Sequence, residues 1–131
     1  MQSRAILDAG ARAASELGFS LWWWRERASG ELVGQVGLNA AEIDGVPVVE
    51  VGWSLSPQRW GKGFASEAAA ASLAFGFERI GLECIVSFTM VENLASRRVM
   101  ERIGLRYVGD FERESLPHVL YDARRAECSR A

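Results

Sequence analysis

A glycine-rich segment between a strand-forming run and an alanine-rich run constrains this chain most. Residues 57–67 read PQRWGKGFASE, and Gly61 and Gly63 lie where a strand must turn into a helix. Glycine adopts positive φ angles and lets a ligand approach the backbone closely. The N–H groups and positive dipole end of the following helix then form a site for a phosphate or pyrophosphate, and Lys62 adds a positive side chain. The segment predicts an enzyme that binds a nucleotide-like cofactor.

The composition excludes several other classes. The 131 residues, 49% of them hydrophobic, suffice for one domain over residues 1–131. A net charge of −2 argues against a nucleic-acid partner, and no apolar run is long enough to span a membrane. Cys84 and Cys128 are far apart and in no CxxC pattern, which favours reduced thiols in a cytoplasmic protein. His118 is the only histidine, so we expect no metal.

Hydrophobic periodicity predicts the order α-β-β-β-α-β-α-β-β. The expected helices cover residues 3–17, 65–80 and a stretch that starts after Asn93 and ends before Gly104. The expected strands cover residues 19–26, 32–39, 48–55, 83–90, 105–111 and 118–123. This order favours an α/β fold with a mixed sheet and helices packed on its faces.

Two longer blocks carry a resemblance to a known family. Residues 50–68 read EVGWSLSPQRWGKGFASEA, and residues 91–109 read VENLASRRVMERIGLRYVG. With both blocks in this order, the chain resembles the GNAT superfamily of N-acetyltransferases over residues 19–124. Within it, the chain is most similar to the RimJ/RimL-like branch, which acetylates ribosomal-protein N-termini and similar amines. The resemblance implies a mostly antiparallel central sheet with helices on both faces.

The resemblance implies acetyl-CoA as the cosubstrate. The superfamily's loop pattern, Q/R-x-x-G-x-G/A, fits residues 60–65 with Trp60 in place of Gln or Arg. We expect the pyrophosphate on the N–H groups of residues 62–65 and the pantetheine arm beside Asn93. The expected cofactor-binding residues are Trp53, Ser54, Leu55, Arg59, Trp60, Gly61, Lys62, Gly63, Phe64, Ala65, Asn93 and Ser96.

Glu50, on the third expected strand, is the candidate general base, because an ammonium must lose its proton before it attacks a thioester. A carboxylate among valines tends to have a raised pKa. Strand alternation leaves open that Glu50 is merely a solvated strand residue. By resemblance, N–H groups near Ser54 and Leu55 bind the thioester carbonyl, because a bulge at this point lets two strands splay apart.

The residue that protonates the leaving thiolate stays open. Many relatives carry a tyrosine four residues before the glycine that ends the second-block helix, and Met100 stands there in this chain. Ser96 is the candidate that the resemblance favours. A bound water, Tyr107, Tyr121 or unassisted departure of the thiolate are the alternatives, since a thiol is a fairly good leaving group.

Other interpretations compete with a catalytic one. Asn93 is in any case a helix cap, and Ser96 could be a small surface residue. Trp22, Trp23 and Trp24 favour core and edge packing over a binding box. The main alternative to an N-acetyltransferase is a catalytically inactive acyl-CoA-binding or interaction module, which shares the cofactor loop and differs in turnover.

The superfamily usually begins with a strand and a long helix that have no counterpart in this sequence. Without that strand, residues 19–26 (FSLWWWRE) would form an exposed aromatic edge. We therefore expect a homodimer that covers this edge, or an N-terminally shortened gene product. The acceptor amine stays undefined, because a fold does not determine its substrate.

Overall fold

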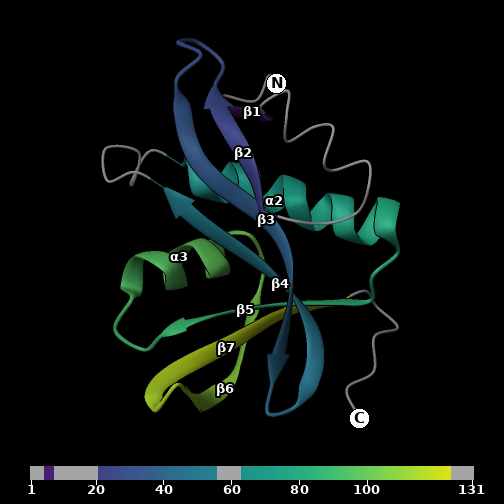
Figure 1. Ribbon diagram of the computed structural model, residues 1–131, viewed down its shortest axis with the longest axis vertical. Helices are drawn as coiled ribbons and strands as arrows, with labels where there is room; N and C mark the ends of the chain where they lie inside the picture. Colours follow the sequence, from purple (N-terminus) through teal and green to yellow (C-terminus); the bar gives the residue numbers. More distant parts are fainter. Residues whose placement is uncertain (1–4, 8–20, 56–62, 125–131) are drawn as a thin grey trace.

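A computed structural model describes residues 5–7, 21–55 and 63–124 (Figure 1). In this part of the chain, one mixed sheet has the strand order β1-β2-β3-β4-β5-β7-β6. Its strands are β1 (Ala5–Leu7), β2 (Leu21–Glu26), β3 (Leu32–Ile43), β4 (Val46–Leu55), β5 (Cys84–Met90), β6 (Arg106–Arg113) and β7 (Leu116–Arg124). The helices are α2 (Phe64–Phe75), the π-helical η2 (Gly76–Ile80) and α3 (Leu94–Arg102). The predicted mixed, mostly antiparallel sheet is confirmed, since only β4 and β5 pair in parallel.

The first element differs from the prediction. Ala5–Leu7 is a strand, not part of a helix over residues 3–17, and it pairs antiparallel with β2 from Trp24 to Glu26. Backbone groups at the edge of β2 offer partners that a short segment uses more readily than it starts a helix. The prediction that β2 is an open edge is therefore wrong for Trp24–Glu26. The rest of the predicted helix lies outside the described residues.

The tryptophans of β2 divide between the core and the surface. Trp22 and Trp24 are buried on the side of α2, where the rings of Trp22 and Phe75 meet edge to face at 5.3 Å. Trp23 points to the opposite face and is 45% exposed. The interpretation of this run as core and edge packing is confirmed for Trp22 and Trp24, whose side chains face the core because strand residues alternate.

Both described helices lie on the same face of the sheet. Small buried side chains, Ala65, Ala68 and Ala69, let α2 pack closely against β3 and β4. On α3, Val99 and Met100 join the same core. In the described part of the chain, the expected covering of both faces is thus seen on one face only. No helix in these ranges is long and apolar enough to cross a membrane.

The predicted helix boundaries agree with the structure. Gly63 is the N-cap of α2 at a φ of 81°, and Gly81 follows η2 at a φ of 84°. Asn93 caps α3 by accepting a hydrogen bond from the Ser96 N–H at 3.2 Å. Gly104, at a φ of 95°, follows the end of α3. These caps place the starts of α2 and α3 beside the strand ends that they follow.

Strands β4 and β5 are paired at a single position, Glu50 opposite Val86. Beyond it the strands separate, and Figure 1 shows β4 and β5 leaving their common point in different directions. The hydroxyl of Ser87 donates to the Val51 carbonyl at 2.9 Å where the gap begins. The predicted splaying of two strands is confirmed.

Candidate active site

A pocket of about 290 Å³ occupies the gap between β4 and β5. Glu50 and Gly52 reach it from the face of the sheet without described helices, and Trp53 reaches it from the helix-bearing face. Its lining residues are Leu21, Glu50, Val51, Gly52, Trp53, Ser87, Phe88, Thr89, Asn93, Ser96 and Met100. The pocket therefore brings together four predicted site residues, namely Glu50, Trp53, Asn93 and Ser96.

Glu50 has the environment expected of a general base. Its side chain is half-buried, and loss of hydration raises its pKa above the ordinary value of 4.5. A hydrogen bond with Asn39 and the charge of Arg113 act in the opposite direction but do not cancel the rise. A carboxylate with a raised pKa is a stronger base for the proton of an ammonium. The alternative of a merely solvated residue is disfavoured.

Ser96 lies in the first turn of α3 and is buried. Its Oγ accepts a hydrogen bond from the indole N–H of Trp53 at 3.1 Å. Because Trp53 occupies a lone pair of this oxygen, the Ser96 O–H is left to donate, and the described residues offer it no acceptor. The alternative of a small surface residue is wrong for Ser96.

The backbone of β4 supplies donors to the gap. The Val51 carbonyl accepts from Ser87 across the gap, so Val51 directs its backbone groups toward β5. Backbone groups alternate between the sides of a strand, so the N–H groups of Trp53 and Leu55 also point into the gap, and that of Ser54 points to β3. The expected donor at Leu55 agrees with this geometry, whereas that at Ser54 does not.

The described part of β4, which ends at Leu55, lacks the bulge predicted near Ser54 and Leu55. The register of β3 and β4 is unbroken from Ile43–Val46 to Gly34–Leu55. Gly34 makes this pairing possible, because a Cβ on it would lie 2.3 Å from the Ser54 carbonyl oxygen. The splaying of β4 from β5 thus needs no irregularity in β4. It follows from the single pairing of Glu50 with Val86.

The start of α2 has the features expected of an anion site. Gly63 has no side chain to cap the helix, and no side-chain cap is present. Phe64 and Ala65 are buried behind it in the first turn. The Ser66 hydroxyl is buried and has no hydrogen-bond partner among the described residues. The sequence patterns did not indicate Ser66 as a site residue. Arg59, Trp60, Gly61 and Lys62 lie outside the described residues.

Neither tyrosine lines the pocket. Tyr121 is buried under α3, where its hydroxyl donates to Glu101 at 3.0 Å. Tyr107 is exposed, and the hydrogen bond that it donates to Asp110 raises its pKa. Among the side chains that the sequence left open as the acid, only Ser96 faces the gap.

Two neighbours of Glu50, Asn39 and Arg113, were not indicated by the sequence. Asn39 lies opposite Glu50 on β3, and the Arg113 guanidinium stacks 4.6 Å from the ring centroid of Phe88. Phe88 also meets the ring of Phe111 at 6.0 Å. Arg113 lies far from Glu50 in sequence, so only the strand pairing of the hairpin could have indicated it.

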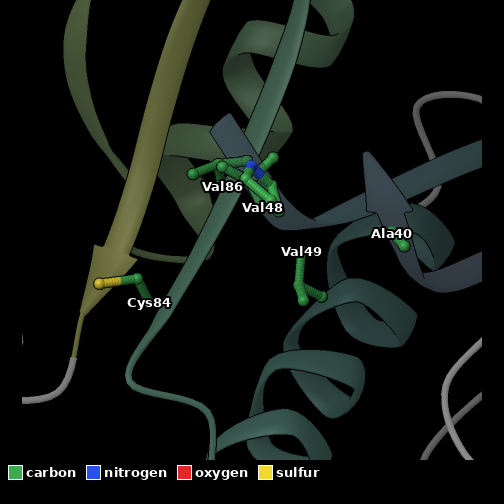
Figure 2. A pocket seen from close by; sticks show the side chains of 6 residues that line it. Ala40, Val48, Val49, Cys84 and Val86 are labelled. Atoms are coloured by element: carbon green, nitrogen blue, oxygen red, sulfur yellow. The ribbon is translucent and has the colours of Figure 1, made fainter. Parts of the chain in front are cut away.

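A larger pocket of about 380 Å³ lies on the other side of the Glu50–Val86 pair (Figure 2). Ala40, Val48, Val49 and Val86 make it almost entirely apolar, so it offers no acid–base group. Cys84 at its edge is disulfide-bonded, and the prediction of reduced thiols is wrong for this residue. Distance along a sequence does not set distance in a fold. Cys128 lies outside the described residues, and a cytoplasmic location stays a prediction.

These features are typical of one class of protein, the acyltransferases. The sequence model of a family described as an acetyltransferase (GNAT) domain matches residues 1–106. The chain belongs to this family, as predicted. Its similarity to RimJ supports the predicted RimJ/RimL-like branch. In the described residues, no cluster of His, Cys, Asp or Glu could hold a metal ion.

Similar proteins support this assignment. A GNAT-family acetyltransferase from Bacillus anthracis superposes with a TM-score of 0.67 at 31% identity, over 79% of this chain and 64% of that chain. RimJ from Mycobacterium smegmatis, solved with CoA-disulfide, gives 0.69 at 25% identity, over 94% and 61%. The uncharacterized protein YkkB of Bacillus subtilis is 31% identical over 94% of this chain and 72% of its own length. The uncharacterized N-acetyltransferase YnaD of that organism is 44% identical over 49% of this chain and 38% of its length.

Proposed function

We propose that this protein transfers an acetyl group from acetyl-CoA to a primary amine, with Glu50 as the general base. One observation carries the proposal. The gap between β4 and β5 presents Glu50 from one face of the sheet and Ser96 from the other. An amine that enters beside Glu50 can then meet a thioester that lies beside Ser96, which is the geometry that direct transfer needs.

The residues of the helix-bearing face fit acetyl-CoA, whose thioester supplies an activated acetyl group. The start of α2 at Gly63, where no side chain caps the helix, suits its pyrophosphate. Asn93 and Ser96 border the pocket where the pantetheine arm would reach the gap. That RimJ, a similar protein, was solved with CoA-disulfide supports the same ligand for this chain.

Each residue has a distinct role in the transfer. The Glu50 carboxylate takes a proton from the acceptor ammonium, so that the amine lone pair can form the new C–N bond. The N–H group of Leu55, which points into the gap, donates to the oxyanion that develops on the carbonyl oxygen. As the C–S bond breaks, the nitrogen of the new amide loses its second proton to solvent, and the Ser96 O–H donates a hydrogen bond to the departing thiolate, which stabilises its charge. The hydrogen bond from the Trp53 indole N–H orients the Ser96 hydroxyl.

Thiol release tests the proposal. The protein is mixed with acetyl-CoA and a panel of amines and N-terminal peptides, and free coenzyme A is measured against time. We expect acceptor-dependent release that Glu50→Gln reduces by about a hundredfold to ten-thousandfold. Glu83→Gln, an exposed glutamate that precedes β5, is the matched control and should behave as the parent protein.

Binding of coenzyme A, measured by calorimetry, separates the two interpretations. Binding without thiol release for any acceptor would contradict an N-acetyltransferase and favour a catalytically inactive acyl-CoA-binding module. If coenzyme A does not bind and no thiol is released, both the N-acetyltransferase and the acyl-CoA-binding module are contradicted. Equal turnover by Glu50→Gln and the parent protein would remove Glu50 from the proposed mechanism.

A further inference from the structure

Arg113 is a positive charge at the acceptor side of the pocket that the transfer chemistry does not use. Its guanidinium carbon lies 4.6 Å from the ring centroid of Phe88, and Phe88 lines the pocket together with Glu50. Strand pairing places Phe88, Glu50 and Arg113 on the same face of the sheet, the face without described helices. Arg113 also lowers the pKa of Glu50 through its charge. The two groups are therefore close enough to act on one small molecule.

The guanidinium is held in a fixed position. Its Nη1 donates to the Glu42 carbonyl at 2.8 Å, which ties the end of β6 to β3. The aromatic ring beneath it limits movement from the other side. An arginine that is ordered before a ligand binds loses little conformational entropy on binding, so its remaining donors are effective.

Arg113 also retains donor capacity. A guanidinium presents several N–H donors, and the Glu42 carbonyl uses Nη1. The described residues place no carboxylate within salt-bridge distance of Arg113. Among the described residues, Arg113 thus has donors left for an anionic oxygen of a ligand.

A wall of rings borders this position. The ring centroids of Phe111 and His118 lie 5.6 Å apart, and both rings contact the ring of Phe88. Nδ1 of His118 lies 2.9 Å from the Leu116 carbonyl, which can only accept, so Nδ1 donates this hydrogen bond. An ionic contact beside apolar rings is less screened by water than one on an open surface.

We propose that Arg113 is a specificity-determining residue that selects acceptor amines carrying an anionic group next to the amine. Glu50 attracts the ammonium of such an acceptor, and Arg113 binds its carboxylate. The inference rests on the proposed acetyl transfer and narrows its substrate class. Two sources share this chemistry, namely the α-carboxylate of a free amino acid and the side-chain carboxylate of an acidic first residue in a peptide.

Matched acceptor pairs test the inference. One arm compares free amino acids with their α-amides, and the other compares peptides that begin with aspartate with those that begin with asparagine. The quantity is the ratio of kcat/KM for the anionic member to that for the neutral member. Differences in amine pKa within a pair cancel when this ratio is compared between proteins.

We expect Arg113→Gln to lower the ratio by about tenfold to a hundredfold in the arm that holds the true acceptor, chiefly through the KM of the anionic member. Arg113→Lys should keep part of the preference, because it keeps the charge but loses the planar fork. Arg79→Gln, on exposed η2, removes the same charge elsewhere and should leave the ratio unchanged. A purely structural role would lower turnover of both members alike and would leave the ratio as it is.

Binding gives a readout that does not depend on turnover. The same pairs are titrated into CoA-loaded protein by calorimetry, and the ratio of Kd values is compared between the parent protein and Arg113→Gln. A preference for the anionic member that Arg113→Gln abolishes supports the inference even if no thiol is released, in which case only acetyl transfer fails. An equal ratio in both proteins, or no binding of any pair, overturns the role of Arg113.

Discussion

The indole N–H of Trp53 donates to the Ser96 hydroxyl at 3.1 Å and so joins β4 to α3 across the gap between the separated strands. The Ser96 backbone is also fixed, because its N–H donates to the Asn93 side chain. The Trp53 bond orients the serine hydroxyl before any ligand binds, and the Asn93 bond fixes the backbone that carries it. A hydroxyl that is oriented in advance costs no reorganisation when a thiolate forms beside it.

Ser96→Ala should lower kcat by about tenfold to a hundredfold and leave the affinity for acetyl-CoA nearly unchanged, because the hydroxyl acts on a charge that develops only during the reaction. Trp53→Phe keeps an aromatic side chain, though a smaller one, and removes the N–H, and we expect a smaller loss of about twofold to tenfold. Steady-state kinetics measure both effects. Ser29→Ala, in the exposed β2–β3 turn, is the control. Full activity of Ser96→Ala would show that the thiolate leaves unassisted.

Glu50→Gln should raise stability while it lowers activity. The pKa of Glu50 is higher in the folded protein than the value of 4.5, so the folded state binds this proton more tightly than the unfolded state. The free energy of unfolding of the parent protein therefore falls as pH rises from 4.5 through the folded pKa. Glutamine cannot ionise, so the free energy of unfolding of Glu50→Gln does not fall with pH for this reason.

Denaturant titrations at a series of pH values measure this difference. Glu50→Gln should be the more stable protein at neutral pH, and the difference between the proteins should shrink as pH falls toward and below 4.5. Glu83→Gln, which removes a negative charge at an exposed position, is the matched control. A Glu50→Gln protein that is less stable than its parent at neutral pH would contradict the burial argument.

Gly63→Ala tests the start of α2 as the pyrophosphate site. Gly63 has a φ of 81°, and an alanine there should cost about 1–2 kcal/mol of stability. Gly45 has a φ of 80° with open space around it, so Gly45→Ala carries the same strain at the β3–β4 turn. Thermal unfolding should detect a loss in both variants. Calorimetry should detect weaker coenzyme A binding in Gly63→Ala alone, and equal binding by both variants would count against the site.

Gly34→Ala should destabilise the protein by about 3 kcal/mol, because the new Cβ would lie 2.3 Å from the Ser54 carbonyl oxygen and 2.8 Å from the Leu55 Cα. The backbone of β4 must then move where its amides face the gap. Gly52→Ala is the stability control, since its nearest neighbour would be a Leu21 methyl group at 3.8 Å. Denaturant unfolding compares the two. Equal stability of both variants would show that the end of β4 is free to shift.

The homodimer through β2 stays a prediction. The pairing of β1 covers only Trp24–Glu26, and Trp23 remains 45% exposed on the face without described helices. If this region forms the interface, Trp23→Arg should convert a dimer into a monomer in sedimentation velocity, because a buried unpaired charge opposes association. A parent protein that sediments as a monomer would refute the dimer.

The sequence predicted where the helices α2, η2 and α3 begin and end. Gly63, Gly81, Asn93 and Gly104 end or begin helices where the sequence indicated, because caps and positive φ angles are properties of a few neighbouring residues. The helix predicted at Ala5–Leu7 was wrong. This segment is a strand because it pairs with β2, and the spacing of apolar residues along the sequence does not reveal such pairing.

The candidate site divides in the same way. Glu50, Asn93 and Ser96 lie in the blocks that carry the family resemblance, and the structure brings them to one pocket. Arg113 escaped notice, since it reaches the site only through the pairing of β6 with β7 and β7 with β5. The reduced state of Cys84 was also wrongly inferred, because sequence separation says nothing about contact in space.

The lone Glu50–Val86 pairing divides the sheet into two leaves, one of β1 to β4 and the other of β5 to β7. Elsewhere, widening a slit between neighbouring strands would break a whole ladder of backbone bonds. At this seam one backbone rung and the Ser87 hydrogen bond join the leaves, so the hydrophobic core that both leaves share beneath the helices supplies most of what holds them together. The carboxylate proposed as the base sits at that one rung, where the two leaves are fixed to each other.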